Sequence, residues 1–261
     1  MRTKFAFAIM LALLPLVGEA GSTKAPGIDH SPYSRVLDQH VEDGWVDYEA
    51  LKKDPSDLLT YIGRLARAPM EKLGRDEKMA TYINAYNAFT LKLITEYDPE
   101  IDSIKDIPGG LFSKKRWKDK RWNIGGEIYS LSQIEHKILR KEFEDPRIHF
   151  ALNCASIGCP VLRGEPYTGE KLDKQLDAAA RTYNQSPRGL RLNRKKGVIY
   201  VSQIYDWFKK DFLKESDSIL DYVAQYAERD VARYIRRHKD KLKIKDIDYD
   251  WSLNGLENKP E

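Results

Sequence analysis

Apolar positions recur at helical spacing over much of the chain, and the clearest run extends from about Asp76 to Tyr97. On one face of this segment the apolar side chains fall three and four residues apart, which predicts an α-helix. They are Met79, Tyr82, Ile83, Tyr86, Thr90, Leu93, Ile94 and Tyr97. Another face is also mainly apolar and carries Asn84 and Asn87. Since a helix that is apolar around most of its circumference lies inside a fold, we expect both Asn side chains to be buried and hydrogen-bonded.

Two more helices are predicted in the second half of the chain. The first follows two overlapping capping boxes, Ser130 with Gln133 and Ser132 with Glu135. Its apolar stripe includes the position of Glu135, so we expect this carboxyl in a sheltered place. The second helix begins near residue 217 and ends in a basic run, which complements the negative end of its dipole.

Alternation of apolar and polar residues predicts several short strands. Hairpins are indicated over 122–129 and 190–200, a buried strand over 147–153 and a last strand over 247–253. Helices mixed with mostly antiparallel strands predict an α+β fold in a single domain. Its centre would be the buried helix of residues 76–97, packed on a small sheet.

The N-terminal segment predicts export. Residues 1–20 combine a basic start, an apolar run and small residues before Gly21, which is the pattern of a cleavable signal peptide. We expect a flexible leader over 21–30, one domain over 31–254 and a polar tail over 255–261, in a periplasmic or secreted protein. Cleavage removes two basic residues and one acidic residue, so the net charge changes from +4 to +3, and this does not indicate a nucleic-acid partner.

Composition limits the role of the cysteines. The chain is 41% hydrophobic and has 15 tyrosines, so it can form a core without covalent staples. Its two cysteines, Cys154 and Cys159, lie close together in the sequence. In an oxidising compartment they could form a local disulfide but not a disulfide framework.

The segment 145–160 contains the highest density of residues that could act in catalysis. The predicted buried strand delivers Cys154 into a loop that contains Gly and Pro, where free backbone N–H groups could lower a thiol pKa. This arrangement predicts a cysteine hydrolase or acyltransferase in which Cys154 is the nucleophile and His149 or His136 is the general base. Strand alternation places His149 and Cys154 on opposite faces, so they meet only if the strand ends near residue 153.

The amides of the central helix complete this hypothesis. Asn84 or Asn87 would orient the imidazole of the general base. Papain-like and transglutaminase-like enzymes place the nucleophilic cysteine at the start of a central helix, ahead of the histidine strand. Here the corresponding helix offers Asn84, so a chain of that fold would lack the usual nucleophile.

Each candidate residue also has a purely structural interpretation. Cys154 and Cys159 could form a disulfide or remain as buried thiols, and His149 could be a hydrogen-bonded histidine of the core. The two Asn side chains could form hydrogen bonds with nearby backbone groups. Glu135 suits either an ion pair with Arg147 or the role of a catalytic acid. The spacing of the His and Cys residues matches no standard zinc pattern, so neither a metal nor another cofactor is predicted.

Five motifs together resemble the "domain of unknown function 547" family. They are Asn84-Ala85-Tyr86-Asn87-Ala88, Ser130-Leu131 with Ile134-Glu135-His136, the run from His149 to Pro160, Tyr205-Asp206-Trp207-Phe208 with Asp211-Phe212, and Tyr249 to Asn254. The resemblance covers roughly residues 31–254. It implies bacterial exported and plant relatives and supplies no activity. Some members have been labelled glutaredoxin-like, but the Cys-x4-Cys spacing of this chain differs from Cys-x-x-Cys.

Residues 113–122 interleave basic side chains with two Trp rings. Such a segment suits peripheral contact with an anionic surface, or a solvated loop whose rings tuck back onto the domain. Three functions stay open. They are the cysteine hydrolase or acyltransferase, acting on an envelope substrate, a non-catalytic binding module with a buried polar core and a local disulfide, and thiol–disulfide exchange. The sequence does not identify the substrate, the partner or the oligomeric state.

Overall fold

The computed structural model describes residues 27–97, 101–107 and 115–260, so the expected signal peptide and most of the leader lie outside the described residues. The helices are α1 (Ser31–His40), α2 (Tyr48–Lys53), α3 (Ser56–Ala66), α4 (Arg75–Thr95), α5 (Lys115–Lys118), α6 (Leu131–Gln133), α7 (Leu172–Asn184), α8 (Ile204–Trp207), α9 (Lys209–Phe212), α10 (Ile219–Tyr226) and α11 (Arg229–His238). The strands are β1 (Val41–Glu42), β2 (Trp45–Val46), β3 (Trp122–Ile124), β4 (Glu127–Tyr129), β5 (Leu190–Asn193), β6 (Val198–Ser202) and β7 (Lys243–Ile247). A π-helix, η3 (Ile134–Phe143), and a 3₁₀-helix, η4 (Pro146–Phe150), carry much of the candidate site.

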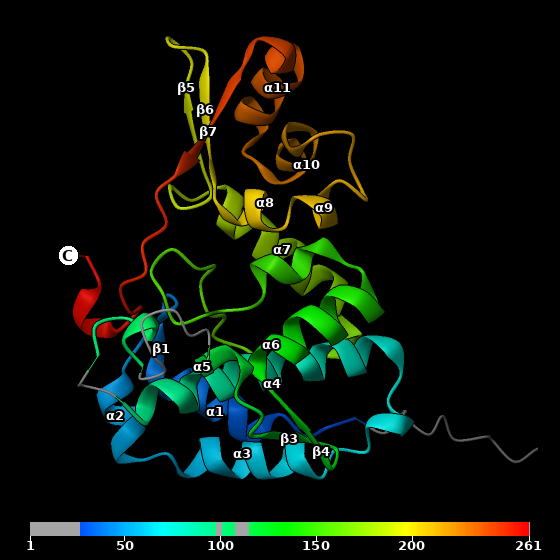
Figure 1. The fold of residues 1–261 in the computed structure, drawn as a ribbon, viewed down its shortest axis with the longest axis vertical. Helices are drawn as coiled ribbons and strands as arrows, with labels where there is room; N and C mark the ends of the chain where they lie inside the picture. The colour runs from blue at the N-terminus through cyan, green and yellow to red at the C-terminus, as the bar shows by residue number, and fades with distance from the viewer. Residues whose placement is uncertain (1–26, 98–100, 108–114, 261) are drawn as a thin grey trace, which may run out of the picture.

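The predicted α+β fold is confirmed. Figure 1 shows β5, β6, β7, α10 and α11 at one end of the molecule and α1 to α4 at the other, with α7, α8 and α9 between them. Antiparallel pairs join β1 to β2, β3 to β4 and β5 to β6, and β7 lies parallel to β6. Because α10 and α11 separate β6 from β7 in the chain, they supply the long connection that a parallel pair requires.

Helix α4 is the buried central helix that the apolar periodicity predicts. Almost every residue from Met79 to Thr95 is buried, including Asn84 and Asn87. Its neighbours are mainly helices, and its contact with the small β3–β4 sheet includes the stacked rings of Phe89 and Trp122, whose centroids are 4.7 Å apart.

Two hydrophobic clusters make up the core. One surrounds α4, and the other lies among α7, β6, α10 and α11. Helix α7 contributes Leu172 and Leu176 to the first cluster and Ala179 and Tyr183 to the second. This helix therefore connects the two ends of the molecule and supports the site between them.

Two predicted strands are corrected. Residues 147–153 do not form a strand, because the side chain of Asp145 caps the backbone N–H of Arg147 and Pro146 occupies the first helical position, so the chain enters η4 instead. The last strand is β7, which ends at Ile247, and the described segment after it makes only isolated bridges, at Ser252, Leu253 and Gly255.

The last residues of the expected leader, over 27–30, are described and pack against the rest of the protein. The His30 side chain, in the predicted leader, is buried and its Nδ1 lies 2.8 Å from the Tyr61 hydroxyl. At the other end of the chain, Lys259 pairs with Glu42 and Asp43 of the β1–β2 turn.

Candidate functional site

Helix η3 presents three polar side chains to one side of the molecule. The predicted Ser130–Gln133 capping box starts this region, whereas the second predicted box at Ser132 does not form. In a π-helix residues four and five apart lie about one turn from each other, so Arg140 lies near both Glu135 and His136, and its Nη1 is 3.3 Å from His136 Nδ1. Long π-helical segments are rare and often mark functional sites.

Glu135 is a sheltered carboxyl without a close permanent cation. Its side chain is 17% exposed, accepts a hydrogen bond from the Tyr86 hydroxyl, and lies 3.7 Å from His136 Nδ1. Desolvation raises the pKa of this carboxyl to about 7, against smaller opposing effects of Arg140 and Tyr86. The predicted pairing with Arg147 is wrong, because Arg147 binds three other carboxylates, those of Asp145, Asp173 and Asp177.

Asp211 of α9 joins η3 to η4. Its carboxylate lies 2.6 Å from Arg140 Nε and 2.8 Å from His149 Nε2. Desolvation alone would raise the pKa of Asp211, but hydrogen bonds from His149 and Arg140 hold it well below its ordinary value. Phe208 stacks on the His149 ring at 3.8 Å and lies under the Arg140 guanidinium.

The His149 ring is a buried, carboxylate-bound imidazole. Its side chain is 1% exposed, and burial lowers its pKa even though Asp211 favours the charged form. Its partner is a carboxylate and not an Asn, so the Asn-oriented imidazole expected from the sequence does not form at this position. Within the described residues no hydrogen bond or ion pair joins His149 to Cys154.

Cys154 and Cys159 form a disulfide with a Cα–Cα distance of 6.2 Å. The sulfur of Cys154 lies 3.1 Å from the Ser156 hydroxyl and 3.3 Å from the Tyr249 hydroxyl. Tyr249 also donates to the Cys159 sulfur at 3.1 Å. A disulfide sulfur is not a thiolate, so the structure presents no cysteine nucleophile in this state.

Tyr249 lies against the disulfide, and its hydroxyl is within electrostatic range of Glu135. Desolvation raises the pKa of the Tyr249 hydroxyl, and the nearby Glu135 carboxyl adds to this shift. The segment that carries Tyr249 is held against the disulfide loop by backbone bonds from Ile157 and Gly158 to Ser252 and Asp250. Tyr249 and the two cysteines therefore form one cluster, and Glu135 lies close enough to influence the Tyr249 hydroxyl electrostatically.

The two central amides position loops rather than an imidazole at the disulfide. Asn87 donates to the Ala151 carbonyl at 3.0 Å and accepts from the Asn153 N–H at 2.9 Å, which fixes the backbone entering Cys154. Asn84 makes the same two-way contact with the backbone of Tyr167. The expectation of buried, hydrogen-bonded Asn side chains is confirmed for both.

An aromatic surface borders the site. Trp207, which is 44% exposed, and Trp251 stack with ring centroids 5.7 Å apart, and both contact the Tyr249 ring. The Lys105 ammonium lies 3.8 Å from the centroid of Trp251. We call Trp207, Tyr249 and Trp251 the aromatic wall.

The basic segment over 113–122 is described only from residue 115 onward. Trp122 is buried on Phe89, Trp117 packs against the core, and Arg121 pairs with Glu96. In this part of the segment the two rings face the domain, as the second sequence interpretation proposes.

Four further residues contribute to the site and are not predicted from the sequence. They are Tyr86, Arg140, Asp211 and Tyr249. Tyr86, Asp211 and Tyr249 belong to motifs on which the family resemblance rests, and those motifs are the one signal in the sequence that points to them. No group of three or more His, Cys, Asp or Glu residues placed to hold a metal ion occurs in the described ranges. In those ranges no helix is long and apolar enough to cross a membrane.

Comparison with known proteins gives one match. The family described as "Protein of unknown function, DUF547" matches residues 70–183, a range that includes α4, η3, η4, the disulfide loop and most of α7. Asp211 and Tyr249 lie beyond this range. No curated protein and no solved structure matches the chain.

Proposed function

We propose that the protein is a hydrolase or acyltransferase with Glu135 as its general acid–base. The chain belongs to the DUF547 family through residues 70–183, and the description of this family assigns no activity. The proposal therefore comes from the geometry of the site. The observation that carries this proposal is the Glu135 carboxyl itself. It is sheltered yet 17% exposed, lies on a π-helix, and has a pKa of about 7. A group with this pKa can both accept and donate a proton at neutral pH.

The proposed reaction cleaves an ester or amide bond. The Glu135 carboxylate takes a proton from water or an acceptor alcohol, whose oxygen adds to the substrate carbonyl. The protonated carboxyl then gives this proton to the leaving group as the carbonyl re-forms. Arg140 and His136, which is 43% exposed, lie where they could stabilise the oxyanion. The aromatic wall would hold the substrate against this site.

Cys154 has a different part in this proposal from the one the sequence suggests. While it is joined to Cys159 it cannot attack a carbonyl, so water or an alcohol is the nucleophile. The disulfide holds the loop beneath Tyr249. Cys154 would become a nucleophile only after reduction of this bond.

The test is hydrolysis of a panel of p-nitrophenyl esters and anilides by the oxidised protein. We expect Glu135→Gln to lower kcat/KM by at least ~100-fold, the usual scale of a lost general base. The wild-type rate should rise with pH around an apparent pKa of about 7. Glu142→Gln, an exposed change on the same helix, is the matched control and should leave kcat/KM unchanged.

Two outcomes would contradict the assignment. Activity that survives in Glu135→Gln would remove Glu135 from the chemistry. Activity that appears only after reduction, and disappears in Cys154→Ser, would return the role of nucleophile to the cysteine.

A non-catalytic binding module is the second candidate function. It is favoured by the disulfide, which leaves no free thiol among the described residues, and by the aromatic wall, whose Trp207 ring is exposed. In this case Trp207→Ala would abolish ligand binding, and Glu135→Gln would leave it intact.

We also propose that the protein acts outside the cytoplasm. The N-terminal signal pattern and a disulfide suited to an oxidising compartment support this location. The intact mass of protein recovered from the periplasm or medium should correspond to a chain that starts at or near Gly21 and lacks the two thiol hydrogens of Cys154 and Cys159. Iodoacetamide should label neither cysteine before reduction. A retained N-terminal segment would contradict export, and labelling without reduction would contradict the disulfide.

A further inference from the structure

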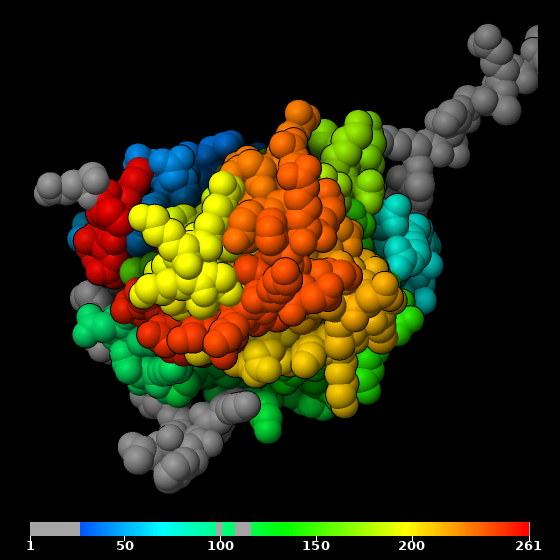
Figure 2. Space-filling view, turned by 90° about the horizontal axis from the view of Figure 1, so that it is seen from above, coloured from blue at the N-terminus to red at the C-terminus, as the bar shows by residue number. Residues whose placement is uncertain are grey.

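A surface hollow of about 420 Å³ lies among α7, the end of α10 and α11. Five arginines line it, and none of its lining residues is acidic: Arg181, Arg229, Arg233, Arg236 and Arg237. Figure 2 shows α11 (orange) on the outer face of this end of the molecule. The hollow is far along the chain from Glu135, and its function does not depend on the proposed reaction.

The arrangement follows from the sequence of α11. Arg229, Arg233 and Arg237 recur every four residues, which places them along one side of the helix. Ala232 and Ile235 are buried on the side that packs against the domain. Three guanidinium groups are therefore held in a row by a helix that is itself anchored.

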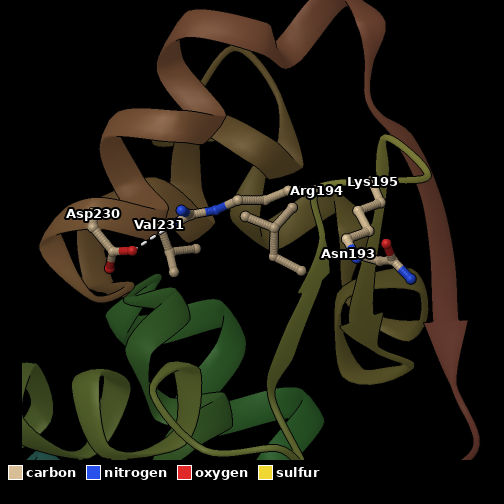
Figure 3. A pocket seen from close by; sticks show the side chains of 6 residues that line it. Asn193, Arg194, Lys195, Asp230 and Val231 are labelled. Carbon is tan, nitrogen blue, oxygen red and sulfur yellow. Dashed lines mark hydrogen bonds and ion pairs between the residues drawn. The ribbon is translucent and has the colours of Figure 1, made fainter.

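Nearby carboxylates do not neutralise this row. Figure 3 shows Arg194 reaching from the β5–β6 turn to pair with Asp230, the acidic residue within α11. Glu228 precedes the helix and does not line the hollow. In the described part of the chain, Arg229, Arg233 and Arg237 have neither a hydrogen bond nor an ion pair from their side chains.

The other two arginines make weak or neutral contacts. Arg181 lies 3.9 Å from Asp177, whose closer partner is Arg147 at 2.9 Å. Arg236 donates to the Ala224 carbonyl at 2.9 Å, which ties α11 to the end of α10. Five cationic groups thus converge on one hollow with at most a single distant carboxylate beside them.

We propose that this hollow binds a ligand that carries two or more phosphate groups. Guanidinium groups match phosphate oxygens with paired, charge-assisted hydrogen bonds. A ligand with one carboxylate would neutralise the charge of only one of the five arginines. A phosphate monoester carries nearly two negative charges, so a ligand with two or more phosphates matches the charge of the hollow better. The volume is in the range of small-molecule sites, so a compact polyphosphate or the phosphate headgroups of lipids would fit.

The test measures binding of tripolyphosphate by calorimetry, and of phosphatidylglycerol-containing vesicles by sedimentation, both at about 150 mM salt, where weak surface attraction is screened. The variant is Arg233→Gln with Arg237→Gln, which changes two exposed side chains without partners and should leave the melting temperature unaltered. Lys195→Gln with Lys196→Gln is the control, because it removes the same charge from the exposed β5–β6 turn.

We expect the arginine variant to bind at least ~10-fold more weakly and the lysine control to bind like the wild type. Binding of tripolyphosphate identifies a soluble phosphate ligand, and binding of vesicles alone identifies lipid headgroups; either supports the proposal. Binding of neither probe would overturn it. An equal loss in both variants would also overturn it, since that result would show only an effect of net charge.

Discussion

At pH 8 the Glu135→Gln variant is expected to be more stable than the wild type by about 3 kcal/mol. The reason is the difference between the pKa of this carboxyl in the folded state, about 7, and its ordinary value of 4.5. A difference of roughly 2.5 pKa units corresponds to about 3 kcal/mol of folding free energy. A neutral amide carries no such cost and can still accept the hydrogen bond from Tyr86.

The sign depends on which state loses its proton first. Below pH 4.5 the carboxyl is protonated in both states, and the two proteins should differ little. As the pH rises from 4.5 to about 7, the unfolded chain loses its proton while the folded protein keeps it, so the wild type is progressively destabilised. Above pH 7 both states are ionised and the difference is constant.

Urea denaturation of both proteins between pH 4.5 and 8, with the disulfide intact, measures this effect. The difference between the two free energies of unfolding cancels the titration of all groups that they share. Glu142→Gln, an exposed change on the same helix, is the control for the loss of one carboxylate from η3. A constant difference between wild type and Glu135→Gln across the range would show that the carboxyl has an ordinary pKa.

The expected cost to stability, once measured, would support a functional role for Glu135. A residue that destabilises the folded protein at neutral pH by several kcal/mol is not explained by its packing, since Gln would serve better there. Active sites commonly keep such groups because the reaction requires them. The same substitution should therefore increase stability and remove activity.

Local sequence patterns predicted the parts of this fold that local interactions determine. The periodicity of residues 76–97 predicted α4 and the burial of Asn84 and Asn87, and the Ser130–Gln133 box predicted the start of the next helical region. The hairpin of β5 and β6 followed from alternation around a short turn. In each case the controlling contacts are a few residues apart.

The segment 147–153 shows where such patterns fail. A short apolar run fits a buried strand and a buried helical turn equally well, and periodicity cannot separate them. The Asp145-Pro146 pair decided the outcome, because Asp145 caps the next turn and Pro146 fits its first position. The spacing of apolar residues also did not predict that η3 is a π-helix.

The site was predicted as a set of residues but not as an arrangement. Cys154, His149 and Glu135 were recognised from their chemistry and context. Their partners come from far along the chain: Asp211 is 62 residues beyond His149, and Tyr249 is 95 beyond Cys154. No spacing rule within a helix or strand reaches over such distances, so the Asp–His pair and the Tyr–disulfide contact required the folded structure.

Asp211→Ala is expected to lower the free energy of unfolding at pH 7 by about 3 kcal/mol or more. The substitution leaves the buried His149 ring without its acceptor and the Arg140 guanidinium without its carboxylate. Removing one partner of a sheltered ion pair usually costs this much, because the remaining charge keeps its desolvation penalty. Asp206→Ala, an exposed change on the neighbouring α8, is the control and should cost less than about 0.5 kcal/mol.

The pH dependence of this cost has a definite sign. The pKa of Asp211 is depressed in the folded protein, so its stabilising effect is complete above the ordinary value of 3.8 and is lost as the pH falls through and below that value. The difference between wild type and Asp211→Ala should therefore be constant near neutral pH and shrink in acid. A double-mutant cycle with Arg140→Met should give a coupling of about 1–3 kcal/mol. Strict additivity of the two changes, or an Asp211→Ala cost no larger than that of Asp206→Ala, would mean that Asp211 does not hold η3 and η4 together.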